Sequence, residues 1–189
     1  MAARKAPYAL NKSKYLLPDE VTRLEYLLDS YMDRDRRNCT FLYLALYSGA
    51  RVQEILNLKK DDLDTSEQSV FLKGIKGSRD RELPIPAWLF KYLVLVSAAA
   101  SERSYPPLSE EQRDLIFPIS YNRARQIWQH YRPVPKKLHC LRHTFAIRLY
   151  KKTKDLRLLQ MALGHRNIAN TMIYADYVYS QQELRKLIL

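Results

Sequence analysis

The stretch LGHRNIANTMIYADY, residues 163–177, holds the pattern around which the rest of the chain can be interpreted. Gly164 is suited to end a helix predicted over 155–163, because glycine readily adopts the left-handed conformation that closes many helices. His165 then lies at the break, and a second helix displays Tyr174 nine residues further on. A tyrosine hydroxyl, with a pKa of about 10, is a useful nucleophile only where other groups neutralise charge on its target and take its proton. Because the chain has 14 tyrosines, ordinary core packing is the alternative role.

Groups of the required kind occur in KLHCLRHTFAIRLY, residues 137–150. His139 and Arg142 lie three residues apart and therefore share one face of a predicted helix. An imidazole next to a guanidinium is unfavourable unless an anion lies between them, and a phosphate accepts hydrogen bonds from both. Taken alone, such a pair is more often a basic turn on a solvent-exposed helix face.

Two further cationic side chains are associated with turns. Arg51 follows the turn YSGA and begins a predicted helix, whose N-terminus attracts anions, and Glu54 could orient it. Residues 69–85 combine apolar runs with glycines and predict a β-hairpin. A lysine near its turn, Lys76 or Lys73, could donate a proton. An exposed arginine and a charged hairpin tip are the ordinary interpretations of these features.

The combination is more specific than its parts. In chain order it consists of Arg51, a hairpin lysine, His139, Arg142, His165 and Tyr174. Two arginines, two histidines, one lysine and one tyrosine, without an acidic cluster to hold a metal, indicate metal-free phosphoryl transfer to a tyrosine. We therefore predict no metal and no cofactor.

The bulk composition points to an anionic partner. The formal net charge is +12, the isoelectric point is near 9.7 and hydrophobic residues make up 47% of the chain, as in a globular protein. Nucleic acid is the first candidate partner and an acidic membrane surface the second; a basic surface without a partner is the third interpretation. No apolar run of about 18 residues predicts a membrane span. Only Cys39 and Cys140 are present, which favours the reducing cytoplasm.

Hydrophobic periodicity predicts an α+β fold that is mostly helical, with one small antiparallel β-sheet. Helices are predicted over 18–32, 40–49, 50–58, 86–100, 121–131, 138–151, 155–163, 168–174 and 181–189. The polar segment 101–114 is predicted to be a loop. We divide the chain into a basic N-terminal arm (1–16), a catalytic domain (17–180) and a C-terminal helix (181–189).

Four segments together resemble the tyrosine recombinase (integrase) family. YSGARVQEILNL (47–58) is similar to the family's first arginine box, with Ser48 in the place of the usual threonine. KGSRDRELPIP (76–86) is similar to its β-hairpin and LHCLRHTFA (138–146) to its H-x-L-R-H segment. LLQMALGHRNIANTMIYADY (158–177) is similar to the segment that carries the family's second histidine and its nucleophile.

The resemblance implies a catalytic site and a role for each residue in it. The implied catalytic residues are Arg51, Lys76, His139, Arg142, His165 and the nucleophile Tyr174. Counting back from Pro84 favours Lys76 over Lys73, and His143 is implied as a neighbouring supporting residue. The implied reaction is site-specific cutting and rejoining of DNA through a 3′-phosphotyrosyl intermediate, as in integration, excision or inversion.

The resemblance also implies partners and an architecture. Double-stranded DNA is the implied substrate and a homotetramer on DNA the implied assembly, without a membrane partner. The helix at 181–189 is implied to dock on a neighbouring protomer or on its own domain. Family members usually carry a helical core-binding domain before the catalytic domain. We expect this chain to lack it, either as a recombinase with a catalytic domain alone or as a fragment. Two alternatives remain open, namely a DNA-binding regulator with idle catalysis and a type IB topoisomerase.

Overall fold

The computed structural model describes residues 10–75, 77–99, 109–175, 185 and 188–189. Lys76 therefore lies outside the described residues, as do residues 1–9 and most of the predicted helix at 181–189. In the part described, no helix is both long enough and apolar enough to cross a bilayer.

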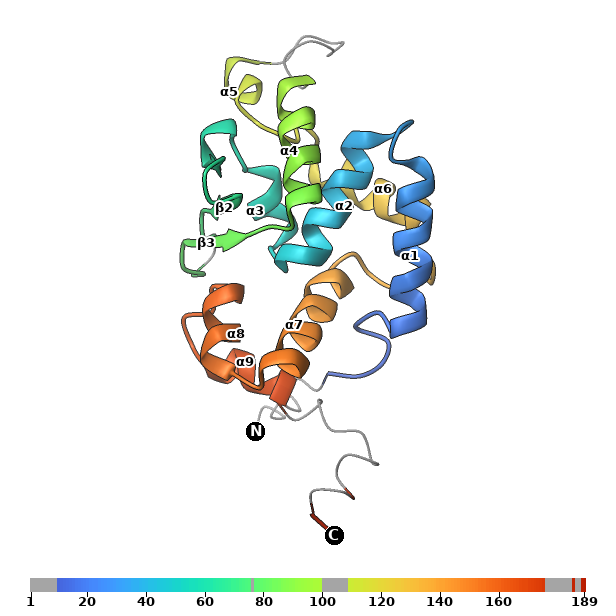
Figure 1. Cartoon of the computed structure of the whole chain (residues 1–189), viewed down its shortest axis with the longest axis vertical. Helices are drawn as coiled ribbons and strands as arrows, with labels where there is room; N and C mark the ends of the chain where they lie inside the picture. The colour runs from blue at the N-terminus through green and yellow to red at the C-terminus, as the bar shows by residue number, and fades with distance from the viewer. Residues whose placement is uncertain (1–9, 76, 100–108, 176–184, 186–187) are drawn as a thin grey trace, which may run out of the picture.

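The described chain folds into helices arranged around one central helix, with a small sheet at the side (Figure 1). The helices are α1 (Pro18–Tyr31), α2 (Arg36–Ser48), α3 (Val52–Leu56), the 3-10 turn η1 (Lys60–Asp62), α4 (Ala87–Ala99), α5 (Glu110–Arg113), α6 (Tyr121–Tyr131), α7 (Cys140–Thr153), α8 (Leu156–Leu163) and α9 (Ala169–Ala175). The strands are β1 (Leu63–Asp64), β2 (Ser69–Leu72) and β3 (Arg81–Pro84). They form one antiparallel sheet in the order β1-β2-β3. The predicted mostly helical α+β class with one small antiparallel sheet is confirmed.

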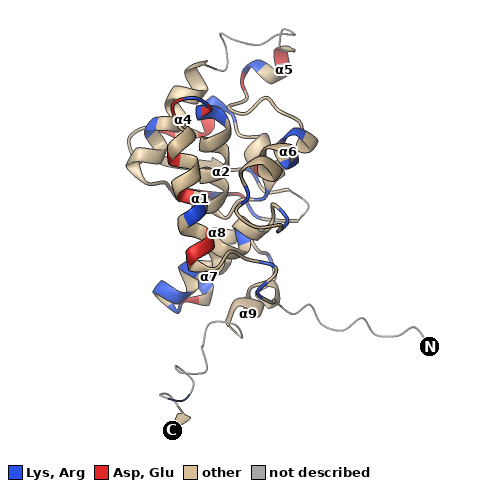
Figure 2. Cartoon of the chain, turned by 90° about the vertical axis from the view of Figure 1, so that its right-hand side faces the viewer, with Lys and Arg blue, Asp and Glu red and all other residues tan. Residues whose placement is uncertain are grey.

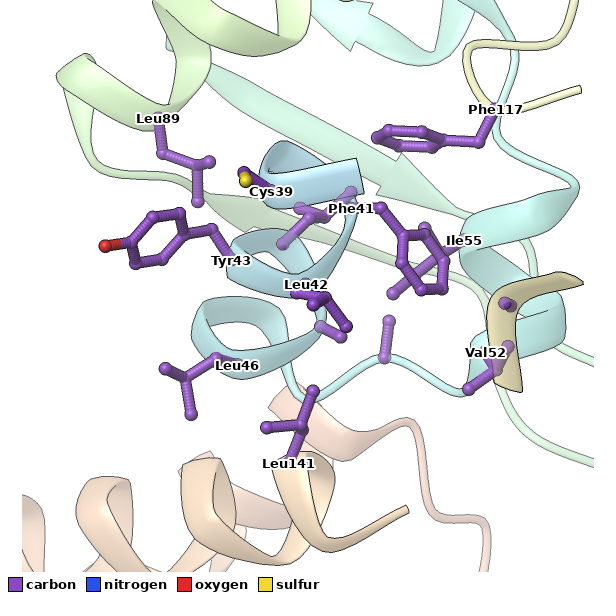
Figure 3. Close-up of a cluster of buried hydrophobic side chains, with 14 of the residues drawn as sticks. Cys39, Phe41, Leu42, Tyr43, Leu46, Val52, Ile55, Leu89, Phe117 and Leu141 are labelled. Atoms are coloured by element: carbon purple, nitrogen blue, oxygen red, sulfur yellow. The ribbon is translucent and has the colours of Figure 1, made fainter. Parts of the chain in front are cut away.

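The central helix α2 is buried on most of its surface because its sequence is apolar almost all round. Figure 3 shows Phe41 and Leu42 of α2 among side chains from α3, α4 and α7, including Ile55 and Leu141. In Figure 1, α2 lies among α1, α4 and α6, and α7 to α9 form the part of the molecule below it. This first core therefore fixes α3 and α7 relative to each other, and with them Arg51, which precedes α3, and Arg142, which lies on α7.

A second, smaller core lies under α7, α8 and α9. Its buried residues are Leu10, Ala146, Ile147, Tyr150, Leu159, Leu163 and Tyr174. Leu10 belongs to the predicted arm, and the Leu16 N–H donates a hydrogen bond to Thr144 Oγ1 at 2.8 Å. The segment before α1 therefore packs against α7 close to Tyr174.

The end of α2 is set by Gly49, which takes the left-handed conformation at φ 59°. A Cβ atom at Gly49 would lie 2.2 Å from Cδ1 of Phe145 on α7, so the two helices approach too closely for any side chain there. The chain then turns, and Arg51 becomes the residue that precedes α3. The left-handed backbone and the close contact with α7 therefore account for the glycine that lies two residues before Arg51.

The structure adds short elements that the sequence does not predict. Strand β1 has two residues and pairs with β2 through Leu63 and Val70. Helix α5 lies in the polar segment predicted to be a loop. Ser109 precedes this helix, and the Ser109 N–H donates to the Gln112 side chain at 3.2 Å. Both elements are shorter than the window in which periodicity is detectable.

Candidate active site

Arg142 is held in place by the ends of two helices. It lies in the first turn of α7, is 3% exposed and donates from Nη1 to the Gly49 carbonyl at 2.6 Å. Its Nη2 donates to the Leu163 carbonyl at 2.8 Å and lies 3.0 Å from Nε2 of His165. Gly49 and Leu163 lie at the C-terminal ends of α2 and α8, where the helix dipoles favour a cation. The fold thus fixes the guanidinium before any ligand arrives.

Arg51 is oriented by the buried carboxylate of Glu54. The Arg51 N–H donates to Glu54 Oε2 at 2.8 Å, and its Nη1 lies 3.2 Å from Oε1. Unlike Glu54, the Arg51 side chain is 31% exposed, so part of the guanidinium remains available to an anion. The predicted orienting role of Glu54 agrees with these contacts.

The same carboxylate binds the β-hairpin. Arg81 of β3 donates from Nη2 to Glu54 Oε2 at 2.8 Å and from Nε to the Ala162 carbonyl at 2.7 Å, and Ser78 Oγ donates to Glu54 Oε1 at 2.9 Å. The Arg79 N–H donates to the Gly164 carbonyl at 2.9 Å. Arg81 therefore connects the hairpin, α3 and the end of α8 through one buried guanidinium.

Arg81 matches the arginine of the family's β-hairpin segment, but no role is predicted for it from the sequence. Its burial is visible in the alternation of β3, where Arg81 and Leu83 face inward and Glu82 and Pro84 face outward. Its Nη1 has no hydrogen-bond partner among the described residues. A charged residue on the apolar face of a predicted strand is the signal that could have identified it.

His165 is placed by the turn between α8 and α9. Gly164 ends α8 in the left-handed conformation at φ 68°, and His165 follows it, as the sequence predicts. His165 Nδ1 lies 3.0 Å from Thr171 Oγ1, while Nε2 faces Arg142. Because a guanidinium can only donate, Nε2 must accept, and the neutral ring carries its proton on Nδ1. Thr171 is thus a second positioning residue. It matches the threonine of the family segment that carries the second histidine and the nucleophile, but no role is predicted for it from the sequence.

Tyr174 lies on α9 and its hydroxyl meets a histidine. The side chain is 2% exposed, and Oη lies 2.9 Å from Nδ1 of His143 on α7. His143 is also buried, and its ring packs edge-on against that of His139 at 4.8 Å between centroids. The residue implied only as a supporting neighbour therefore contacts the predicted nucleophile directly.

These side chains line one cavity of about 570 Å³. Its lining consists of Arg51, His139, Arg142, His143, His165, Ala169, Asn170, Ile173 and Tyr174. Five of the six predicted catalytic residues are therefore brought together, and the sixth, Lys76, lies outside the described residues. Lys73 instead forms an ion pair with Asp62 at 3.0 Å.

The cationic surroundings shift the pKa values of the cavity residues. Burial, followed by the charges of Arg142 and Arg51, lowers the pKa of His165 to about 4. The same causes lower the pKa of His139 to about 4, although His139 is exposed, so water screens its neighbours and we expect a smaller shift than at His165. Burial and then Arg51 lower the pKa of Arg142 to about 10, which leaves it charged at neutral pH.

The site has the electrostatic character of a receptor for one anion. Two guanidinium groups carry fixed positive charge, and the imidazoles are neutral until an anion compensates their neighbours. Among the described residues, no group of three or more His, Cys, Asp or Glu side chains is placed to share a metal ion. Lys and Arg also lie on α6 and at the end of α7, outside the cavity (Figure 2).

Known proteins share both the sequence pattern and the fold. The sequence profile of the phage integrase family matches residues 14–181. Tyrosine recombinase XerA of Thermococcus kodakarensis is 34% identical over 194 residues, which cover 97% of this chain and 66% of that protein. Tyrosine recombinase XerC of Bacillus pumilus is 30% identical over 190 residues, which cover 91% of this chain and 59% of that protein. The chain thus spans 66% and 59% of the lengths of these two relatives.

Solved structures with this fold include a crystal structure of XerA recombinase, with a TM-score of 0.69 and 24% identity over 99% of this chain and 65% of that chain. The catalytic domain of bacteriophage HP1 integrase has a TM-score of 0.62 and 23% identity over 92% of this chain and 94% of that chain. These likenesses confirm the predicted tyrosine-recombinase catalytic-domain fold. Since the family profile covers most of its length, the chain belongs to the phage integrase family.

Proposed function

We propose that this chain is the catalytic domain of a site-specific recombinase that cuts and rejoins double-stranded DNA through a 3′-phosphotyrosyl intermediate. The observation that carries the proposal is that Arg51, Arg142, three histidines and Tyr174 all line the same cavity. A scissile phosphate fits this set, because two guanidinium groups can hold its nonbridging oxygens and stabilise the charge that develops in the transition state. His139 would add a donor to these oxygens. His165 would donate to them from Nε2 once the bound phosphate compensates the arginines, raises the pKa of this imidazole and protonates it.

In the proposed reaction, Tyr174 Oη attacks phosphorus and the 5′ oxygen of the next nucleotide leaves. The leaving oxygen needs a proton, and Lys76 is the proposed donor, on the strength of its position in the hairpin motif. Lys73 is less suited to this role because its ammonium group is paired with Asp62. The covalent link conserves the phosphodiester bond energy, so a 5′ hydroxyl of another strand can reverse the step.

The biological assembly follows from the chemistry of strand exchange. Four active sites must act on two duplexes, and we therefore propose a homotetramer on DNA, acting in the cytoplasm. A solved relative of this fold is XerH site-specific recombinase bound to a difH substrate in a pre-cleavage complex, which supports DNA as the partner. That structure has a TM-score of 0.69 and 24% identity, over 95% of this chain and 53% of that chain.

The test is covalent trapping on a duplex with a nick next to the cleavage position, so that the released fragment diffuses away and the adduct accumulates. We expect a protein–DNA adduct that survives denaturing electrophoresis with the unaltered protein and none with Tyr174→Phe. Tyr121→Phe, on an exposed tyrosine of α6, is the matched control and should form the adduct normally. Specific binding without any adduct would contradict the proposal and support a regulator with idle catalysis. Relaxation of supercoils without junctions or recombinant products would support a topoisomerase.

A further inference from the structure

We propose that His143 is a further catalytic residue of this site and that its Nδ1 takes the proton of Tyr174 during attack. This inference rests on the proposed function, because it assigns a step within that reaction. Its basis is the 2.9 Å contact between His143 Nδ1 and Tyr174 Oη. The distance is that of a hydrogen bond in which the tyrosine hydroxyl donates to a neutral imidazole.

The surroundings leave little room for water to do the same work. Tyr174 is 2% exposed and His143 is 6% exposed, so the hydroxyl faces the imidazole inside the wall of the cavity. His139, by contrast, is exposed and precedes α7, where it can reach a phosphate in the cavity. The geometry therefore separates two tasks, with His139 directed to the phosphate and His143 directed to the nucleophile.

The charge around His143 keeps its ring ready to accept a proton. Four titratable or charged groups act on it, namely His139 before α7, Arg142 on α7, Lys14 before α1 and His165 in the α8–α9 turn. Tyr174 on α9 is its hydrogen-bond partner. Burial, followed by these four groups, lowers the pKa of His143 to about 3. The imidazole is thus neutral at neutral pH. A bound phosphate would compensate the cations and raise this pKa, so the ring becomes a stronger base when substrate is present.

The step balances without any further reactant. As the bond from Tyr174 Oη to phosphorus forms, the O–H electron pair stays on oxygen and the proton moves to His143 Nδ1. The bond from phosphorus to the 5′ oxygen breaks, and that oxygen takes a separate proton from the proposed donor, Lys76. In rejoining, a 5′ hydroxyl attacks the phosphorus of the phosphotyrosine and returns its proton to the neutral Lys76 amine. The bond from phosphorus to Tyr174 Oη breaks, and His143 Nδ1–H gives its proton back to Oη.

The experiment combines loss of the proposed base at position 143 with a tyrosine at position 174 that ionises more easily and so depends less on a base. His143→Asn places an amide oxygen near the position of Nδ1, so it can still accept a hydrogen bond but cannot take a proton. Single-turnover adduct formation on the nicked duplex is measured for this variant with natural tyrosine at position 174 and with a fluorinated tyrosine of lower pKa. We expect a loss of about 100-fold or more with natural tyrosine, the usual effect of a general base. With fluorotyrosine the loss should shrink to within about tenfold, because that hydroxyl ionises without help.

A purely structural role gives a different result. In that case His143→Asn lowers the rate equally with both tyrosines, and this outcome would overturn the inference. So would a His143→Asn rate within a few-fold of the unaltered protein. His143→Ala provides a second measurement, in which added imidazole should restore adduct formation by entering the space left by the ring. Absence of rescue in a His143→Ala protein that still binds DNA would also count against the base. If the unaltered protein forms no adduct at all, the proposed function itself fails.

Discussion

At the scale of single residues, the site depends on groups whose protonation and orientation are fixed before substrate binds. Arg142 donates to two helix-terminal carbonyls and faces His165 within a region nearly closed to water. Desolvation strengthens each of these hydrogen bonds. A substitution of Arg142 that leaves one of the buried acceptors without a donor should therefore be costly. The site is therefore preorganised, and small changes in the shape of a donor should have large effects.

Arg142→Lys tests the shape of this donor. A lysine keeps the charge but cannot reach Gly49, Leu163 and a phosphate at the same time, since it lacks the planar fork. We expect the rate of adduct formation to fall by about 100-fold or more. Arg148→Lys, on the same helix but exposed, is the matched control and should change the rate little. Equal rates for the two variants would contradict the preorganised clamp.

Buried neutral histidines also predict how stability depends on pH. The folded pKa values of His143 and His165 lie near 3 and 4, below the unfolded value of about 6.5. The unfolded chain therefore binds more protons between these values, and the free energy of unfolding should fall as pH drops from about 7 to 5. We expect a loss on the order of 1 kcal/mol per buried histidine, measured by urea unfolding.

The controls for this prediction use the small number of histidines, of which the chain has 4. His130→Gln, at an exposed histidine outside the cavity, is the matched control variant. His165→Gln should make the dependence shallower. A slope that is the same in both variants and in the unaltered protein would show that the buried rings are not its source.

At the scale of elements, the residues that line the cavity come from separate helices and turns, and the β-hairpin is bound to them near the α8–α9 turn. Arg79 and Arg81 of the hairpin contact Gly164 and Ala162 at this turn, and Arg81 also reaches Glu54, which orients Arg51. The hairpin is thus bound both to Glu54, which orients Arg51, and to the turn that carries His165. The hairpin packs so closely against the residue before His165 that only glycine fits there.

Gly164→Ala tests this contact between the β-hairpin and the α8–α9 turn. A Cβ atom there would lie 2.8 Å from the Arg79 carbonyl oxygen and 2.9 Å from Arg81 Nη1, in addition to the strain of φ 68°. We expect a loss of about 1–3 kcal/mol in the free energy of unfolding and slower adduct formation. Gly77→Ala is the matched control, because Gly77 has φ 82° but no atom within 4 Å of its added Cβ. If the loss of unfolding free energy is no larger for Gly164→Ala than for Gly77→Ala, the close packing of the hairpin against Gly164 does not contribute to stability.

The elements also show what the sequence could predict. Long amphipathic or apolar segments such as α1, α2 and α7 follow from periodicity, and Gly164 marks the end of α8 as expected. Motif spacing selected five residues that line one cavity. Spacing could not show that His143 contacts Tyr174 or that Arg81 meets Glu54, since these pairs depend on how helices and strands pack. The roles of the site residues, including Lys76, stay predictions.

At the scale of the whole molecule, the net charge of +12 should control encounters with DNA. Contacts with six to ten phosphates release counterions, and affinity should then fall by about 10³–10⁵ between 50 and 200 mM salt. Fluorescence anisotropy with a labelled duplex measures this slope. Tyr174→Phe should give the same slope, because the hydroxyl is buried and adds no charge. Affinity that is nearly independent of salt would contradict a phosphate-based interface.

The most direct measurement of the central claim identifies the amino acid that becomes joined to DNA. The trapped adduct is digested with a protease and a nuclease, and mass spectrometry locates the residual nucleotide on a peptide. We predict that it lies on Tyr174, linked through a 3′ phosphate. A nucleotide on Tyr177 or Tyr179, or a linkage to the 5′ phosphate, would contradict the account.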